Sequence, residues 1–174
     1  MIVRKASSDK INDIIIFYDK MCKMLGNSSF LPEGNKGGFP SGRLIADSIN
    51  NDELFVGIED DCIMAAYIIN HLCDASYDNV KWQVDANKEE ASILHALRIS
   101  PDYSGRGYAK RLVEHAIQTA KQNKQKAIRL DCIKGNDVPQ KMYLSYGFKY
   151  IDTVDIFYED IGIERKFLLF ELLL

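Results

Sequence analysis

Two strongly patterned runs flank the stretch Pro101-Asp102-Tyr103-Ser104-Gly105-Arg106-Gly107-Tyr108-Ala109. Residues 91–100 read as a strand that ends at the proline, and residues 105–123 alternate apolar and charged positions as an amphipathic helix does. Small residues between a strand and a helix leave backbone N–H groups accessible, and the first turn of a helix carries unpaired amides and partial positive charge. The stretch therefore predicts an anion site suited to phosphate, with cations nearby at Arg106, Lys110 and Arg111.

Two common phosphate loops do not fit this stretch. A P-loop needs Gly-Lys followed by Ser or Thr, which is absent. A dinucleotide fingerprint needs a third small residue where Lys110 stands, and an opening βαβ unit that the sequence lacks. Taken alone, Gly105 and Gly107 would also serve simply to start a helix, so the surroundings must decide.

Outside this stretch, the hydrophobic pattern predicts alternating strands and helices. No repeat or linker interrupts them, so we expect one domain over residues 1–174. Strands are expected at residues 1–5, 54–59, 62–70, 91–100, 127–133, 148–158 and 165–174, and helices at residues 9–25, 43–50, 105–123 and 137–146. The last two strands should form an antiparallel pair, and residues 26–42 should form a loop.

Two blocks of sequence resemble the GNAT N-acetyltransferase superfamily. Ile93 to Pro101 is similar to the fourth strand of these enzymes, and Gly105-Arg106-Gly107 is similar to their pyrophosphate loop, although Asp102 stands where Gln or Arg is usual. Asn136 to Phe148 resembles their second signature, an Asn, a Tyr and then Gly-Phe, with Pro139 where Ala is common. The resemblance covers Ala91 to about Phe157, with the blocks in the family's order and distance.

The resemblance implies a single-domain α/β (α+β) fold with a mixed, mostly antiparallel seven-stranded sheet and about four helices. Its fourth and fifth strands would splay apart, so that the pantetheine of acetyl-CoA pairs with the backbone at Leu97 and Ile99. The backbone amides that would hold the pyrophosphate are those of Gly105, Arg106, Gly107, Tyr108, Ala109 and Lys110. Asn136 matches a position that touches the cofactor, although a helix N-cap would also account for an Asn there.

Acetyl transfer to an amine needs a neutral amine, a polarised carbonyl and a proton for the departing thiolate. By resemblance, Tyr143 is the general acid, since a phenol is protonated at neutral pH. His95 is the candidate general base: strict alternation would place it on one face with Ile93, Leu97 and Ile99, beside the thioester. A backbone N–H near Ile99 would polarise the carbonyl. A core tyrosine and a structural histidine remain the alternatives, and water would then be the base.

Composition excludes several other classes of protein. With a net charge of −3, the chain lacks the concentrated positive charge that binding to nucleic acid requires. The four cysteines, Cys22, Cys62, Cys73 and Cys132, are scattered along the sequence and indicate neither a zinc site nor a disulfide framework. Isolated thiols, no signal-like start and no apolar run of about 20 residues favour a cytoplasmic protein away from membranes.

We therefore expect an acyltransferase that uses acetyl-CoA as co-substrate and acetylates a small-molecule primary amine in a ternary complex. A peptide or protein N-acetyltransferase and a non-catalytic acyl-CoA sensor stay open as alternatives. Trp82 and the loop of residues 26–42 are candidates for the acceptor side. The apolar run Phe167 to Phe170 lies in the final strands, and if these strands are exposed they make a homodimer plausible.

Overall fold

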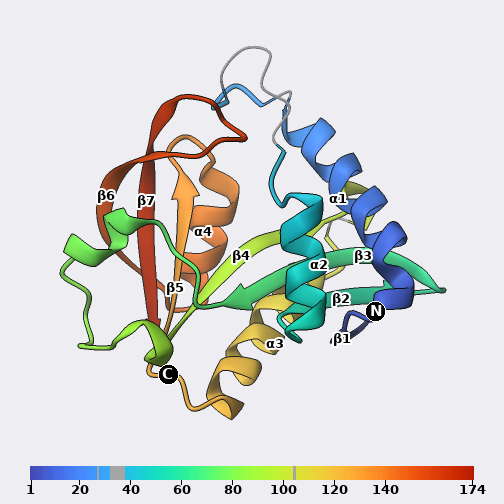
Figure 1. Ribbon diagram of the computed structural model, residues 1–174, viewed down its shortest axis with the longest axis horizontal. Helices are drawn as coiled ribbons and strands as arrows, with labels where there is room; N and C mark the ends of the chain where they lie inside the picture. Colours follow the sequence, from blue (N-terminus) through green and yellow to red (C-terminus); the bar gives the residue numbers. More distant parts are fainter. Residues whose placement is uncertain (27, 32–37, 104) are drawn as a thin grey trace.

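A seven-stranded sheet organises the chain (Figure 1). The computed structural model describes residues 1–26, 28–31, 38–103 and 105–174. The strands follow the order β1-β2-β3-β4-β5-β7-β6, and every neighbouring pair is antiparallel except β4 and β5. Their bounds are β1 Ile2–Lys5, β2 Leu54–Glu59, β3 Cys62–Asn70, β4 Ala91–Ile99, β5 Ala127–Ile133, β6 Lys149–Phe157 and β7 Glu164–Leu173.

Helices cover both faces of this sheet. On one face, α1 Ile11–Leu25 and α2 Gly42–Asn50 pack on β2 and β3 through a cluster that includes Ile14, Tyr18 and Ile45. On the other face, α3 Tyr108–Gln122 buries Leu112, Val113 and Ala116, and α4 Asp137–Ser145 contributes Tyr143. These apolar spacings of three and four residues are the reason that helices form here and face the sheet. The expected helices and antiparallel last pair are confirmed.

Strands β4 and β5 pair over a short length only. Their parallel register joins Ala91 to Ala127, Ser92 to Ile128 and Ile93 to Arg129. Beyond these pairs, β4 continues along β3 and β5 continues along β7, so the sheet opens into a split. The expected splay is thus present, and no strand of the described residues pairs with the backbone edges that face the split.

A β-bulge changes the alternation of side chains along β4. The register with β3 shifts between Ala66 and Ile68, and Ala96 has a φ of 48°. The extra residue sends Leu97 and Ile99 to the α3 face, while His95 pairs with Ile68 on the α1 face. The expectation that His95 shares a face with Leu97 and Ile99 was therefore wrong, because it assumed strict alternation.

The expected exposure of the last strands was also wrong for β7. This strand lies between β5 and β6, and Phe167, Leu169 and Phe170 are buried in the core. The free edge at this end of the sheet belongs to β6 instead. The apolar pattern of β7 therefore reflects a strand buried within the sheet and gives no support to a dimer.

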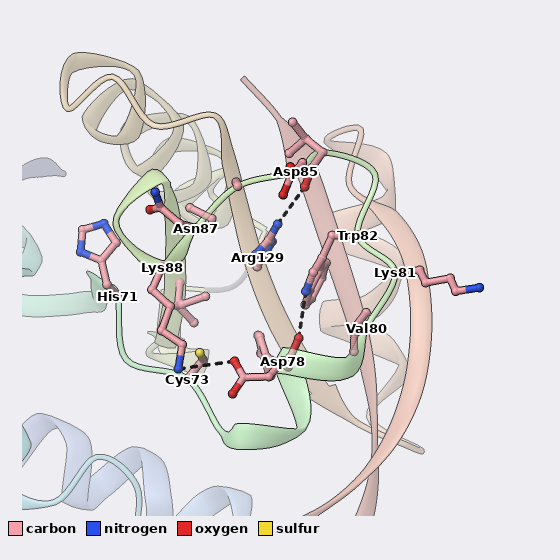
Figure 2. Close-up of a pocket in the computed structure, with 15 residues that line it drawn as sticks. His71, Cys73, Asp78, Val80, Lys81, Trp82, Asp85, Asn87, Lys88 and Arg129 are labelled. Carbon is pink, nitrogen blue, oxygen red and sulfur yellow. Dashed lines mark hydrogen bonds and ion pairs between the residues drawn. The ribbon is translucent and has the colours of Figure 1, made fainter.

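Residues 71–90, between β3 and β4, fold over β5 and β7 (Figure 2). The indole of Trp82 packs against Arg129, whose guanidinium carbon lies 4.3 Å from the ring centroid. Arg129 forms a buried ion pair with Glu171, with 3.0 Å between Nε and Oε1, and donates to the Val84 carbonyl at 3.2 Å. Glu171 also accepts from the Gln83 amide at 2.7 Å, so one pair of strand residues holds the segment.

Replacing Glu171 by Gln should lower the free energy of unfolding by about 3 kcal/mol, because it leaves the buried Arg129 charge without its counter-ion. Chemical denaturation measures this. Lys166→Ala is the control, since it breaks an exposed pair with Asp155 and should cost less than about 1 kcal/mol. Equal losses in the two variants would contradict the anchoring role of the buried pair.

Candidate active site

The glycine turn before α3 is open to solvent. Gly105 and Gly107 have φ values of +76° and +74°, and a Cβ built on either would meet no atom within 4 Å. The glycines are therefore required by the left-handed backbone and not by crowding. Gly107 is the N-cap of α3, and the first turn contains no acidic residue, so the amides from Tyr108 onward are available to an anion. Ser104 lies outside the described residues.

Cationic side chains surround this turn. Arg106 stacks over Tyr103, with 4.9 Å between the guanidinium carbon and the ring centroid, and lies 3.8 Å from Glu59. Lys110 is 3.7 Å from Glu114. Both cations are more than half exposed, so they can turn toward a bound anion. Glu59 is itself held by the amino group of Met1 at 3.1 Å and by the Tyr108 hydroxyl.

Asp102, the departure from the family loop, has a structural partner. It accepts from the Lys20 ammonium at 3.0 Å and from the Ser100 hydroxyl at 3.3 Å. The hydrogen bond and charge of Lys20 hold the pKa of Asp102 below its usual value. In this chain the position thus ties the turn to α1.

A cavity of about 430 Å³ passes through the split between β4 and β5. Its lining includes Leu97, Cys132, Asn136 and Tyr143 on the α3 and α4 side. On the α1 side it includes Asn70, His95, Asp131, Tyr158 and Asp160. This volume is typical of small-ligand sites. Groups from both faces of the sheet therefore line one common cavity.

Tyr143 is buried on α4, with its ring edge-on to Phe148 at 5.3 Å. Burial, followed by the neighbouring Cys132, raises the pKa of the Tyr143 phenol. Burial likewise raises the pKa of the Cys132 thiol. Both groups are protonated at neutral pH, so the phenol can donate a proton and the thiol is a poor nucleophile.

His95 belongs to a hydrogen-bonded chain. Its Nε2 lies 3.0 Å from Asn70 Oδ1, which also accepts from the Leu72 amide at 3.0 Å, while Asn70 Nδ2 donates to Glu53 at 3.4 Å. The Leu72 amide identifies the Asn70 atom as oxygen, so this contact assigns the His95 ring the tautomer that is protonated at Nε2. Burial lowers the pKa of His95 to about 4, against an opposing effect of the Leu72 backbone. The ring is neutral at pH 7.

The other expected cofactor residues divide into two groups. Leu97 lines the cavity, and its carbonyl accepts from Arg98 at 3.0 Å, whereas Ile99 packs against the α3 core and is not part of the lining. Asn136 lines the cavity at the start of α4 and makes no capping hydrogen bond through its side chain. The cap alternative for Asn136 therefore has no support here.

Sequence reasoning missed Asp131, Tyr77 and Tyr158. Both tyrosine hydroxyls donate to Asp131 Oδ2, each at 2.9 Å. Burial raises the pKa of Asp131, partly opposed by these two hydrogen bonds. The available signal was an acid inside an apolar strand, Ala-Ile-Arg-Leu-Asp-Cys-Ile. Trp82, by contrast, lines the neighbouring cavity of Figure 2 and donates to the Tyr77 carbonyl at 3.1 Å.

A family model described as the acetyltransferase (GNAT) family matches residues 27–148, well over half of the chain. This protein belongs to the GNAT acetyltransferase family. No curated protein sequence is significantly similar to it. In the described part of the chain, no group of His, Cys, Asp and Glu is arranged to hold a metal ion, and no helix is long and apolar enough to cross a membrane.

Solved structures share the GNAT fold over nearly the whole chain. A GNAT acetyltransferase from Streptococcus agalactiae has a TM-score of 0.74 at 21% identity, covering 99% of this chain and 94% of that one. A ribosomal-protein-alanine N-acetyltransferase from Brucella melitensis has a TM-score of 0.72 at 14% identity, with 100% of both chains covered. The yncA protein from Salmonella typhimurium, solved with its cofactor acetyl-CoA, has a TM-score of 0.70 at 12% identity, covering 99% and 92%. These identities establish the fold alone.

Replacing Gly107 by Ala should lower the free energy of unfolding by about 1 kcal/mol, because its φ of +74° disfavours a Cβ even in open space. It should also weaken coenzyme A binding, measured by calorimetry, since the turn would distort. Gly42→Ala is the matched control: it also has open space, lies in α2 and should be neutral or stabilising. An unchanged free energy of unfolding in Gly107→Ala would contradict the claim that this turn requires glycine.

His95 should make the stability of the GNAT domain depend on acid pH. Its pKa is about 4 when folded and 6.5 for a free imidazole, so between these values the unfolded chain binds a proton that the folded chain does not. The His95 contribution should be complete above pH 6.5 and should shrink as pH falls toward 4. Denaturation of wild type and His95→Gln across this range measures it, and a pH-independent difference would be evidence against a buried neutral ring.

Proposed function

We propose that this protein transfers the acetyl group of acetyl-CoA to the primary amine of a small molecule by direct attack in a ternary complex. The observation that carries the proposal is the cavity through the split, with Tyr143 in one part of its wall and His95 in another. The family membership supports an acyltransferase. The cavity volume of about 430 Å³ supports a small acceptor over a peptide.

The residues fit coenzyme A in three places. The open turn at Gly105 and Gly107, with the first amides of α3 and with Arg106 and Lys110 beside it, suits the pyrophosphate. The inner edge of β4, unpaired beyond Ile93, suits the pantetheine amides. Asn136, whose side chain makes no cap bond and lines the cavity, is placed to bind the cofactor.

When bound, acetyl-CoA supplies a thioester carbonyl as the electrophile. Tyr143 then holds a proton on its buried hydroxyl and gives it to the departing thiolate. His95 would accept a proton from the ammonium on Nδ1, directly or through water, and would release it to solvent because burial holds the pKa of the ring at about 4; Asn70 fixes the ring through Nε2. A β4 backbone N–H near Ile99 is proposed to polarise the carbonyl.

Four free thiols support a reducing compartment, and we place the protein in the cytoplasm. Thiol release from acetyl-CoA, measured against a panel of primary amines, tests the transferase. Amine-dependent release is expected. Tight coenzyme A binding without release on any amine would favour a sensor, and release only with peptides would favour a peptide acetyltransferase.

Replacing Tyr143 by Phe should lower kcat about a hundredfold, because the thiolate loses its proton donor. Acetyl-CoA affinity should stay nearly unchanged, since the ring remains in place against Phe148. Steady-state kinetics and calorimetry separate the two quantities. Tyr146→Phe is the control, as this residue follows α4 but does not line the cavity. Unchanged turnover in Tyr143→Phe would remove the phenol from the mechanism.

A further inference from the structure

Asp131 presents a carboxylate to the cavity on the α1 side of the split. It pairs with Leu169 across β5 and β7, on the sheet face opposite Cys132 and Tyr143. His95 lies on this same face from the other side of the split, on β4. A group held at Asp131 therefore lies on the opposite face of the sheet from the proposed proton donor and on the same face as the proposed base.

The two hydrogen bonds to Asp131 hold it without neutralising it. Tyr77 and Tyr158 both donate to Oδ2 at 2.9 Å, which leaves Oδ1 with no hydrogen bond from a described residue. Among the ion pairs of the described residues, none includes Asp131. Asp131 is half-buried, and a carboxylate that is partly withdrawn from water without a cation is destabilised; an ammonium ligand would supply the missing charge.

Acidic side chains outnumber basic ones in the described part of the cavity wall. Its described lining includes the acids Asp74 and Asp131, and Arg98 is the one guanidinium among the described lining residues. His95 adds no charge at pH 7. The remaining wall on this side is largely apolar, and includes Leu25, Phe30, Phe39, Leu44, Ile161 and Phe167. Such a site matches a cation attached to an apolar body and repels carboxylates.

The anchor is built from distant segments that are fixed in place. Tyr77 belongs to η2, Ala75–Asn79, and its carbonyl is bound by Trp82, which packs on Arg129 (Figure 2). Tyr158 follows β6 and packs edge-on against Phe167 with ring centroids 5.0 Å apart. The Arg129 and Glu171 pair therefore helps to position a hydroxyl that orients Asp131.

We propose that Asp131, oriented by Tyr77 and Tyr158, binds the ammonium group of the acceptor and selects a small primary amine with an apolar body over amino acids and acidic peptides. The inference rests on the proposed function for the identity of the acceptor. The ammonium would lie between the carboxylate and the neutral His95 ring, where one of its protons would pass to His95 and on to water before the neutral amine attacks.

Binding of 2-phenylethylamine to the full chain with coenzyme A present tests the anchor without turnover. Calorimetry should detect this amine, and should show weaker binding of 2-phenylethanol, which lacks the charge, and of phenylalanine, which adds a carboxylate. Asp131→Asn should weaken amine binding about tenfold or more, as expected for the loss of a charge-assisted hydrogen bond. Asp155→Asn, an equal charge change on the exposed face of β6, should leave it unchanged.

Tyr158→Phe gives a second test, because it removes one hydroxyl from Asp131 and should weaken binding by an intermediate factor. Coenzyme A affinity reports whether each variant is folded, and if Asp131→Asn fails to fold the Tyr158 result decides. Equal binding in wild type and Asp131→Asn, equal binding of 2-phenylethanol, or no binding of 2-phenylethylamine to wild type would overturn the proposal.

Thiol release from acetyl-CoA distinguishes a failure of the Asp131 proposal from a failure of the proposed acetyltransferase activity. If thiol release depends on an amine and the KM for that amine is the same in wild type and Asp131→Asn, the transferase proposal holds and the role of Asp131 is refuted. Amine binding that depends on Asp131, with no thiol release, would keep the anchor and remove the transferase.

Discussion

The parting of β4 from β5 is the constraint on which the rest of the structure depends. Three residue pairs hold the two strands together at one end, and beyond them β4 follows β3 while β5 follows β7. Buried backbone groups require hydrogen-bond partners, so an open edge inside a sheet is stable only where solvent or a ligand reaches it. The cavity supplies that access, and α3 begins with its free amides at the end of the parting strand.

The bulge at Ala96 gives the two faces of the split different chemistry. It turns Leu97 toward the α3 side, where Tyr143 and Cys132 are buried and protonated, and leaves His95 on the α1 side. Asn70, beside the bulge on β3, then fixes the imidazole proton on Nε2. One extra residue thus separates the proposed proton donor from the proposed base by the thickness of the sheet.

Residues 71–90 connect the stability of the sheet to the acceptor side. The buried Arg129 and Glu171 pair holds Trp82, Gln83 and Val84, and Trp82 in turn holds Tyr77 against Asp131. The buried ion pair between Arg129 and Glu171 therefore helps to fix the position of Asp131 in the cavity wall.

The sequence by itself determined the strands Leu54–Glu59, Cys62–Asn70 and Ala127–Ile133, the four helices, and the glycine turn, because periodicity and turn chemistry are local. It also marked Tyr143 and His95, although their roles stay predictions. Only the tertiary structure decided the face of His95, the interior place of β7 and the grouping of Asp131 with Tyr77 and Tyr158. These depend on a bulge, on strand order and on contacts between residues far apart in the chain, none of which leaves a local pattern.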